Sequence, residues 1–491
     1  MKRRITALFL ALALLCAILP TALFSASAAS SGTCGENLTW SYNEATKTLT
    51  ISGSGEMEDF EWGEVPWASI AFDIQTVVIS DGVTSVGDFA FVSCYELKNV
   101  TISDSVTSIG VDAFAWCDSL TSVTIPESMT SIGYCAFLGC SLTSVTIPES
   151  VTSIGNGAFV SNFSLMTFTV AEGNPSYSTD ASGVLFNNDK TELICCPGGY
   201  SGAYTIPSGV TSIGDNAFDN CCDLTGVTIP ESVTSIGNEA FYDCSSLASV
   251  TIGNSVTSIG ERAFEWCTSL TSVTIPESVT NIGEAAFWAC SALMKIAAAE
   301  GNPSYSSDAS GVLFNKEKTE LICCPNGYSG AYTVPDGVRC IGDSAFGYCS
   351  SMTNVTIPES VKSIGESAFM WCSSLTSVTI GNSVTSIGGW AFSGCSSLTS
   401  AYFCGDAPEL DVYVFVLWDE LKEEYIAIPG LTLYYIEGKT GWTTPTWNGY
   451  PTATWKPGSE DKPTTTFTDV KTSDWYYSAV NFAVTNNLFN G

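Results

Sequence analysis

The fold of this chain is decided by a repeat whose fullest copy lies at residues 259–279. That copy reads Ile259-Gly260-x-x-Ala263-Phe264-x-x-Cys267-x-x-Leu270-x-x-Val273-x-Ile275-Pro276-x-Ser278-Val279. Leu270, Val273 and Ile275 are spaced as in a short strand that turns one face to a core, and a proline ends the strand. A single coil of this kind cannot bury its own apolar face, so stacked coils must share one continuous core.

The dipeptide Ala-Phe marks each copy of the repeat. Most copies follow each other at a period of about 23 residues, and two steps are longer because each contains an insertion. The repeat phenylalanines are Phe91, Phe114, Phe137, Phe159, Phe218, Phe241, Phe264, Phe287, Phe346, Phe369 and Phe392. We therefore expect a β-rich solenoid, a rod or arc of about a dozen coils that extends on the order of 60 Å at ~4.8 Å per stacked strand.

A cysteine follows the repeat phenylalanine by three positions in all coils but one. The position holds Cys94, Cys117, Cys140, Asn162, Cys221, Cys244, Cys267, Cys290, Cys349, Cys372 and Cys395. Cysteine and asparagine both hydrogen-bond to backbone groups at a turn, which favours a structural stack of buried thiols. Disulfides between neighbouring coils are the alternative. Zinc sites are disfavoured because the cysteines fall one per coil instead of in clusters.

The two insertions occupy residues 172–207 and 300–335. They have the same length and differ at only five positions, which indicates duplication of a larger block. Residues 183–186 and 191–194, joined by a polar turn at 187–190, predict a β-hairpin. We interpret the vicinal pairs Cys195-Cys196 and Cys323-Cys324 as strand residues of the insertions. The insertions form either a binding edge or tolerated surface loops.

The segments outside the repeats differ from them in composition. Residues 33–73 predict a β cap with a hairpin of 38–42 and 48–52, which covers the exposed edge of the first coil. The repeats occupy 74–404, and the tryptophan-rich residues 405–455 predict the opposite cap. Residues 456–466, rich in proline, threonine and charge, predict a linker.

The composition excludes several functions. The 491 residues contain 17 Lys+Arg, 50 Asp+Glu and no histidine, for a formal net charge of −33. Without histidine, Ser-His-Asp and Cys-His triads and histidine-ligated metal sites are impossible. The negative charge disfavours nucleic acid and anionic membrane surfaces as partners. We expect no metal and no cofactor.

The N-terminal residues predict an export signal. A basic start (residues 2–4), an apolar run (5–19) and Ala26-Ser27-Ala28 predict a secretory signal peptide over 1–28. The apolar run is shorter than the ~20 residues that span a bilayer core. We therefore expect an exported protein with no membrane segment after cleavage.

Two sets of residues are candidates for functional sites. A glycosidase needs a pair of carboxylates in unlike environments. The repeated glutamates Glu127, Glu149, Glu231, Glu277 and Glu359 all occupy one Ile-Pro-Glu-Ser turn position, so they do not predict catalysis. Aromatic residues stand two positions after the repeat phenylalanine in four coils, as Trp116, Trp266, Tyr348 and Trp371. Small or polar residues occupy this slot elsewhere, so the rings either form an exposed partner-binding surface or pack between neighbouring coils.

The repeat resembles the BspA-type leucine-rich repeat family of bacterial surface proteins. The resemblance rests on the Ile-Gly-x-x-Ala-Phe-x-x-Cys-x-x-Leu-x-x-Val-x-Ile-Pro unit and on Cys34-Gly35-x-x-Leu38-Thr39-Trp40 at the start. It implies a right-handed leucine-rich repeat superhelix of short parallel strands. It also implies adhesion to host matrix proteins or to other cells.

The final segment, 467–491, is similar to the first half of an S-layer homology domain. The similarity rests on Phe467-x-Asp469-Val470, Trp475-Tyr476 and Ala479-Val480. Such a domain, when complete, implies anchoring to cell-wall polysaccharide of a Gram-positive bacterium.

From these features we expect a secreted or wall-associated surface protein that recognises an extracellular protein or glycan without catalysis. The alternatives are a scaffold or spacer with no ligand of its own, and a polysaccharide-binding protein.

Overall fold

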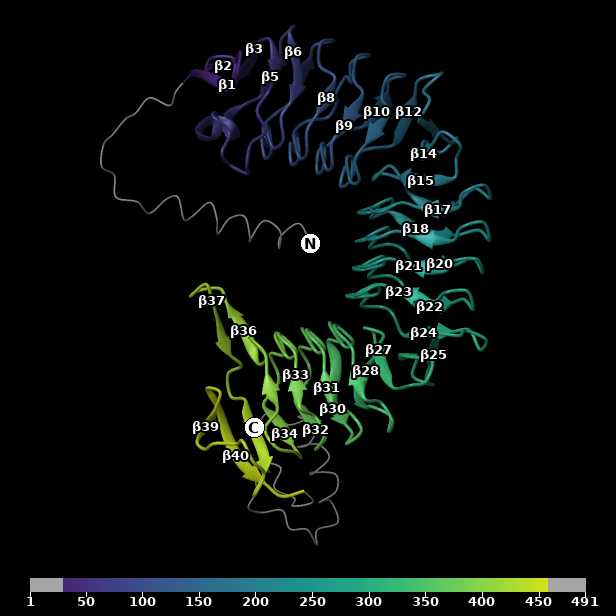
Figure 1. Cartoon of the computed structure of the whole chain (residues 1–491), viewed down its shortest axis with the longest axis vertical. Coiled ribbons are helices and arrows are strands. Elements are labelled where there is room, and N and C mark those ends of the chain that lie inside the picture. The colour runs from purple at the N-terminus through teal and green to yellow at the C-terminus, as the bar shows by residue number, and fades with distance from the viewer. Residues whose placement is uncertain (1–29, 458–491) are drawn as a thin grey trace, which may run out of the picture.

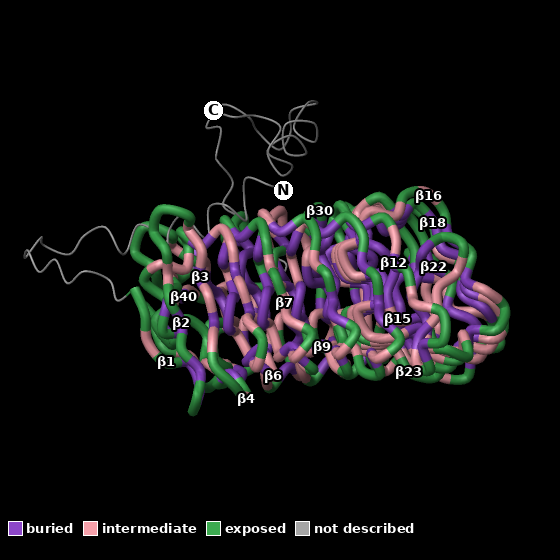
Figure 2. The backbone as a smooth tube through the Cα atoms, turned by 90° about the horizontal axis from the view of Figure 1, so that it is seen from above, coloured by how far each residue is buried: buried purple, intermediate pink, exposed green. Residues whose placement is uncertain are grey.

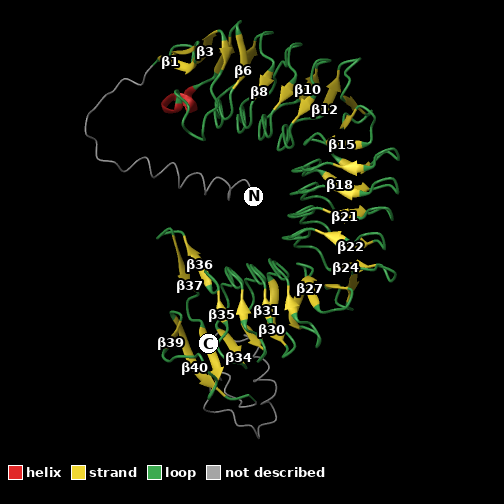
Figure 3. Cartoon of the chain, viewed as in Figure 1, coloured by secondary structure: helices red, strands yellow, loops and turns green. Residues whose placement is uncertain are grey.

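The computed structural model describes residues 30–457, which form an open arc of stacked coils (Figure 1). Each coil has three parts, namely a strand on one flank, a very short strand on a second flank, and a turn segment that connects the second flank to the first (Figure 3). We call the flanks the Val-Thr-Ile flank and the Ser-Ile flank. The turn segments, which run from the glycine after the Ser-Ile strand to the repeat cysteine, together form the turn ladder. The predicted signal peptide (1–28), the linker beyond residue 457 and the segment 467–491 lie outside the described residues.

The Val-Thr-Ile flank carries the strands that the sequence predicts in every coil except that of residues 123–125, which forms no strand. Its strands are β5 (Thr76–Ile79), β7 (Asn99–Ile102), β10 (Ser144–Ile147), β12 (Thr167–Val170), β16 (Gly202–Thr205), β18 (Leu224–Thr228), β20 (Ser249–Thr251), β22 (Ser272–Ile275), β24 (Lys295–Ala298), β28 (Ser329–Thr333), β30 (Ser351–Ile357), β32 (Ser377–Ile380), β34 (Ser400–Phe403) and β38 (Thr432–Ile436). Neighbouring strands are parallel, and equivalent repeat positions pair, as Ser377 does with Ser400. The register therefore follows directly from the repeat.

The Ser-Ile flank was not predicted as strand. Its strands are β6 (Val83–Val86), β8 (Ser108–Ile109), β9 (Ser131–Ile132), β11 (Ser153–Ile154), β17 (Ser212–Ile213), β19 (Ser235–Ile236), β21 (Ser258–Ile259), β23 (Asn281–Ile282), β29 (Cys340–Ile341), β31 (Ser363–Ile364), β33 (Ser386–Ile387) and β35 (Glu409–Leu410). Most are too short to show an alternating pattern. The signal that could have found them is the recurrence of Ser-Ile immediately before the turn glycine.

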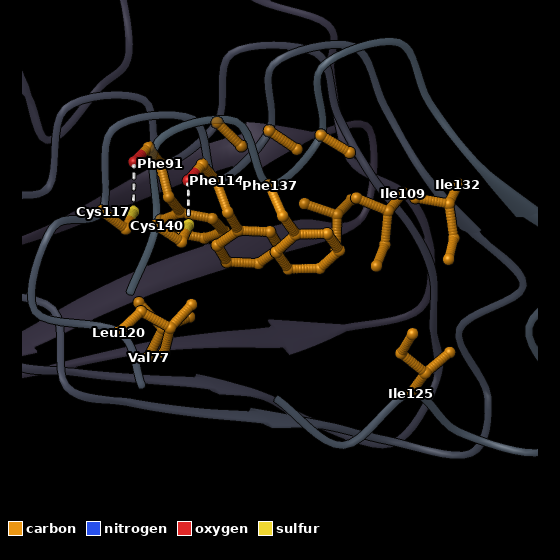
Figure 4. Packing of buried hydrophobic residues seen from close by; sticks show 14 of the residues in the cluster. Val77, Phe91, Ile109, Phe114, Cys117, Leu120, Ile125, Ile132, Phe137 and Cys140 are labelled. Atoms are coloured by element: carbon orange, nitrogen blue, oxygen red, sulfur yellow. Dashed lines mark hydrogen bonds between the residues drawn. The ribbon is translucent and has the colours of Figure 1, made fainter. Parts of the chain in front are cut away.

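The core lies between the two flanks and the turn ladder (Figure 2). The repeat phenylalanines stack ring on ring inside it, as Phe91, Phe114 and Phe137 do with centroids 5.1 and 5.3 Å apart (Figure 4). Leu120 and Val77 lie beneath the rings on the Val-Thr-Ile side. Each ring thus buries its faces against its neighbours in adjacent coils, which no isolated coil provides.

The two insertions are joints that bend the solenoid. They form β13 (Tyr177–Thr179), β14 (Leu185–Asn187) and β15 (Glu192–Cys195) in the first joint, and β25 (Tyr305–Ser307), β26 (Leu313–Asn315) and β27 (Glu320–Cys323) in the second. In each joint the predicted hairpin is present and its last strand pairs in parallel with the next coil. Figure 1 shows the joints at the two corners of the arc, between three arms.

The joints contribute to the core and are therefore more than surface loops. Leu185 and Phe186 are fully buried, and the apolar core divides into three clusters at the joints. The interpretation of both vicinal cysteines as strand residues is wrong for one of each pair. Cys195 and Cys323 end their strands, whereas the following residues lie in the connection to the next coil.

The caps continue the phenylalanine stack with other aromatic side chains. The first cap contains β1 (Ser31–Gly35), β2 (Leu38–Asn43), β3 (Thr48–Gly53), β4 (Gly55–Glu56) and a 3₁₀ helix, η1 (Ala68–Asp73). The second contains β36 (Val416–Asp419), β37 (Glu424–Ala427), β39 (Thr446–Trp447) and β40 (Tyr450–Trp455). Trp67 stacks on Phe91 at 5.5 Å and donates its Nε1–H to the carbonyl of Ala90 at 2.9 Å. At the other end Phe415 stacks on Phe392 at 5.0 Å.

Phe415 is a further repeat phenylalanine that the sequence analysis missed. It follows Phe392 by one full period of the repeat but stands in Val-Phe instead of Ala-Phe. The N–H of Phe392 donates to the carbonyl of Val414 at 2.9 Å, as in the regular coils. The coil geometry therefore extends past the expected end at residue 404, into the predicted cap.

Within residues 30–457, no helix has the length and apolar character to cross a membrane.

Candidate recognition surface

The turn ladder holds neighbouring coils together by backbone hydrogen bonds. In one coil the N–H groups of Glu239, Phe241 and Asp243 each donate to a carbonyl of the next coil at 2.8 Å. Glu239 and Asp243 have positive φ angles of 52° and 47°, a left-handed conformation that is unfavourable for residues other than glycine. The regular ladder stabilises this conformation because every second N–H points along the solenoid axis to an acceptor.

The aromatic slot two residues after the repeat phenylalanine is one of these left-handed positions. Trp116 is 39% exposed and Trp371 is 41% exposed, whereas Trp266 and Tyr348 are half-buried. Each exposed indole lies over a glycine at the same position of the next coil. A Cβ atom added to Gly139 would lie 2.5 Å from Cε3 of Trp116, and one added to Gly394 would lie 2.8 Å from Cδ2 of Trp371. The rings thus pack on the next coil and also present an open face.

Three of the four predicted rings join one cluster at the second joint. The centroid of Tyr348 lies 5.2 Å from that of Trp266 and 6.1 Å from that of Trp371. Trp288 completes the cluster, 4.8 Å from Tyr348 in an edge-to-face arrangement. We call these four residues the aromatic cluster. Trp116 makes no ring contact with it, because Trp116 lies in the first arm.

Trp288 was missed by the sequence analysis. It stands one residue after its repeat phenylalanine and not two, so it lies outside the predicted slot. The tertiary structure brings it to Tyr348 because the second joint contributes no turn segment, and the coils before and after it approach each other. A search for aromatic residues at either position next to the joints would have found it.

A buried carboxylate adjoins the aromatic cluster. Glu265, next to Trp266, is 3% exposed, and its Oε2 lies 3.5 Å from Nε of Arg262. Burial raises the pKa of Glu265 to about 7, although the charge of Arg262 acts to lower it. Arg262 also lies within 3.8 Å of the carboxylates of Glu239 and Glu261. The surface next to the aromatic rings is therefore acidic with one central cation.

The cysteine position lies on the inner side of the turn ladder. The thiols of Cys117 and Cys140 donate to the carbonyls of Phe91 and Phe114 in the preceding coils, at 3.3 and 3.2 Å (Figure 4). The same contact is made by Cys244, Cys267, Cys290, Cys372 and Cys395, at 3.0 to 3.1 Å. Cys221 and Cys349 follow the joints and face carbonyls of the vicinal-cysteine segments instead, at 3.7 to 3.9 Å. At the exceptional coil the Nδ2–H of Asn162 donates to the carbonyl of Phe137 at 2.8 Å.

The cysteines of the described residues are free thiols. Burial raises the pKa of Cys94 to about 12 and also raises the pKa of Cys267 and Cys290 strongly. Thiols with such pKa values are protonated at neutral pH and are poor nucleophiles and poor metal ligands. Across residues 30–457, no group of three or more cysteine or acidic side chains is arranged to hold a metal ion.

The side chains of this surface are arranged for noncovalent binding and not for catalysis of a reaction. Partly exposed indole faces stack on apolar faces of sugars or on planar and cationic groups. The nearby carboxylates favour cationic or hydroxyl-bearing partners. The carboxylates and aromatic rings lie on a regular, rigid backbone ladder, which positions them without the entropy cost of ordering a loop.

The chain is similar to known leucine-rich repeat proteins. The BspA type Leucine rich repeat region matches residues 71–188, 202–309 and 329–436, with six copies. A leucine-rich repeat protein from Eubacterium ventriosum shares 27% identity over 76% of this chain and 96% of its own, with a TM-score of 0.52. A leucine rich cell surface protein from Faecalibacterium prausnitzii shares 26% identity over 67% of this chain and 95% of its own, with a TM-score of 0.40. A search of curated proteins finds no match.

The matched residues cover more than half of the chain and divide at the same two joints that divide the core. The chain therefore belongs to the BspA-type leucine-rich repeat family.

Proposed function

We propose that this protein is an exported bacterial surface protein that recognises an extracellular protein or glycan through the aromatic cluster, without catalysis. The observation that carries the proposal is the continuous contact of Trp266, Trp288, Tyr348 and Trp371 across the second joint. A monomer seldom places so many aromatic rings on one surface unless a partner covers them.

Three further observations support a non-catalytic role. The chain contains no histidine. The repeated glutamates stand at equivalent turn positions of successive coils. The family to which the chain belongs consists of repeat scaffolds. The predicted signal peptide supports export, and the similarity of residues 467–491 to half an S-layer homology domain supports wall association.

The test is binding of the purified chain, in reducing buffer, to matrix proteins, mucins, and plant and bacterial glycans. A Trp266→Ala/Trp371→Ala variant removes two rings of the cluster, and a Trp116→Ala variant tests the isolated ring. Trp62→Ala is the matched control, because Trp62 in the first cap is 57% exposed and its ring contacts that of Phe89, at the opposite end of the solenoid from the second joint.

We expect saturable binding that the double variant loses and the Trp62→Ala variant keeps. Removal of a central aromatic anchor costs ~2–4 kcal/mol of binding free energy, equivalent to about thirtyfold or more in Kd. Binding that survives the double variant would contradict the assignment of the site. A folded protein that binds nothing on the panel would favour the spacer role. Release of products from a glycan would contradict the absence of catalysis.

A further inference from the structure

Both joints interrupt the turn ladder at the same place. In the regular coils the N–H of Phe137 donates to the carbonyl of Ala158 at 2.8 Å, and the N–H of Phe264 donates to that of Ala286. The joints supply no equivalent turn segment. Within the described part of the chain, the N–H groups of Phe159 and Phe287 consequently have no acceptor.

The same gap leaves backbone groups unpaired on both of its walls. On one wall of the first joint the N–H groups of Gly157 and Phe159 lack acceptors, and on the other wall the carbonyl of Asp215 lacks a donor, among the residues that the structure describes. Cys196 replaces one missing bond by donating its N–H to the carbonyl of Ala217 at 2.7 Å. The other backbone groups named above, at this edge of the turn ladder, remain unpaired. We call this edge the open ladder edge.

A cleft lies at each gap. The first has a volume of about 490 Å³ and is lined by Gly157, Phe159, Asn188, Glu192 and Asp215, among others. The second has a volume of about 230 Å³. Most of its lining residues are equivalent, in the duplicated block, to residues that line the first cleft. They include Ala285, Phe287, Glu320 and Asp343. The clefts are thus duplicated features of the two joints.

The lining carries negative charge without a compensating cation. Asp189, Glu192 and Asp215 line the first cleft, and neither lysine nor arginine does. Asp215 accepts hydrogen bonds from the Nδ2–H of Asn156 at 3.4 Å and from the N–H of Asn238 at 2.7 Å. In the second cleft, burial and the neighbouring carboxylate of Asp343 raise the pKa of Glu284.

We propose that the first cleft binds an extended peptide segment that bears a basic side chain. The cleft replaces one turn segment of a backbone ladder, so a polypeptide in that space would accept from Gly157 and Phe159 and donate to Asp215. A lysine or arginine side chain would meet the carboxylates of Glu192 and Asp215. This binding mode is independent of the aromatic cluster.

The sequence differences between the two joints favour the first cleft over the second as the peptide-binding site. Val160 lines the first cleft, whereas Trp288 stands at the equivalent position in the second. Asn326, where the first joint has glycine, donates its Nδ2–H to the carbonyl of Gly347 and completes another ladder bond. The second cleft is narrower and more nearly closed.

The probe is a short capped peptide of alternating threonine and valine with one central lysine, labelled for fluorescence anisotropy. Matched peptides carry glutamine or glutamate at the centre, and one carries the lysine with N-methylated alternate amides. The protein is the full chain, as wild type, as Glu192→Gln/Asp215→Asn and as Val160→Trp. Glu127→Gln, which neutralises an exposed carboxylate on a regular turn, is the control.

We expect saturable binding of the lysine peptide by wild type and by Glu127→Gln, and binding of the glutamine and glutamate peptides weaker by about tenfold or more. Glu192→Gln/Asp215→Asn should remove the preference for lysine, and Val160→Trp should abolish binding. The N-methylated peptide should not bind, because it cannot donate to the open ladder edge. This measurement needs only wild-type protein, so it remains informative if a variant fails to fold.

Equal binding of all peptides, absence of binding, or undiminished lysine preference in Glu192→Gln/Asp215→Asn would overturn the proposal. Binding of chitin oligosaccharides in this cleft, without binding of the lysine peptide, would overturn it in favour of a sugar site. The Trp266→Ala/Trp371→Ala variant should bind the lysine peptide normally, which separates this inference from the function proposed for the aromatic cluster.

Discussion

The side-chain Oδ1 of Asn162 accepts a hydrogen bond of 3.1 Å from the backbone N–H of Leu142 in the preceding coil. In other coils the equivalent leucine N–H donates to the carbonyl of its own repeat cysteine, as Leu120 does to Cys117 at 2.9 Å. The coil of Leu142 is one residue shorter between its cysteine and its leucine, so this local bond is lost. Asparagine replaces cysteine in the next coil because its amide supplies both the missing acceptor and the usual donor.

We predict that Asn162→Cys destabilises the protein by ~1–2 kcal/mol, since the buried N–H of Leu142 then lacks an acceptor. Insertion of one serine between Ser141 and Leu142 in the Asn162→Cys background should recover most of this loss, because it restores the regular turn. The measurement is urea unfolding followed by circular dichroism in reducing buffer. An Asn162→Cys protein as stable as wild type would contradict the explanation.

The phenylalanine stack predicts a large cost for its interruption. Phe264 is fully buried, with Phe241 and Phe287 stacked on its two sides at 5.0 and 5.6 Å. Phe264→Ala should lower the free energy of unfolding by ~3–5 kcal/mol, because it opens a cavity between two coils. Phe163→Ala is the control, since Phe163 is largely exposed, and should change stability by less than ~0.5 kcal/mol. Similar losses in the two variants, measured by urea unfolding, would argue against the stack as a major source of stability.

The glycine that follows an exposed indole along the ladder should control the position of that indole. Gly139→Ala places a methyl group against Trp116, which should shift the ¹⁹F resonance of Trp116 in protein labelled with 5-fluorotryptophan. Gly430→Ala is the control, because Gly430 also has a positive φ but has open space where the methyl group would lie. Both substitutions should cost ~1 kcal/mol of stability through backbone strain. A Trp116 resonance that is unchanged in Gly139→Ala would show that the ring does not rest on this glycine.

Stability should fall as the pH rises from about 4 to about 7. Burial, with a contribution from the charge of Glu239, raises the pKa of Asp219 to about 7, against ~3.9 in an unfolded chain. In that interval the folded state keeps a proton that the unfolded state has released, so deprotonation favours unfolding as the pH rises. Asp219→Asn should reduce this slope and stabilise the protein by ~1–2 kcal/mol relative to wild type at pH 8.

The pH dependence is measured by urea unfolding at several values between pH 5 and pH 8. Asp223→Asn is the control, since Asp223 is exposed and should leave the slope unchanged. Equal slopes for wild type and Asp219→Asn would contradict a raised pKa at this residue.

Thiol exposure should divide the cysteines into two groups. Cys222, Cys323, Cys340 and Cys404 are partly exposed, whereas the other described cysteines are buried. Under native conditions at neutral pH, iodoacetamide should modify Cys222, Cys340 and Cys404 first, and the repeat cysteines should react only after unfolding. Cys323 should react later than these three, because burial raises the pKa of its thiol strongly. Peptide mapping by mass spectrometry measures the order. Rapid modification of Cys244 or Cys267 in the folded protein would contradict their assignment as buried thiols.

The sequence alone determined the repeated part of the fold. Because equivalent positions recur at a constant period, the repeat predicted which residues face the core and which strands pair, and the structure confirms the solenoid. The hairpin of each insertion and that of the first cap were also predicted, since their turns are local. The Ser-Ile strands were not predicted, because a strand of two residues shows no alternation. Phe415 was missed because it stands in Val-Phe instead of Ala-Phe.

Only the tertiary structure decided what happens where the repeat stops. The contact of Trp266 with Tyr348, the bond between Asn162 and Leu142, and the two clefts all depend on how a joint or a shortened coil changes the distance between its neighbours. The repeat period predicts nothing about the structure at positions where the sequence departs from the repeat. There, the arrangement follows from which backbone groups find partners and from the volume that the missing turn segment leaves.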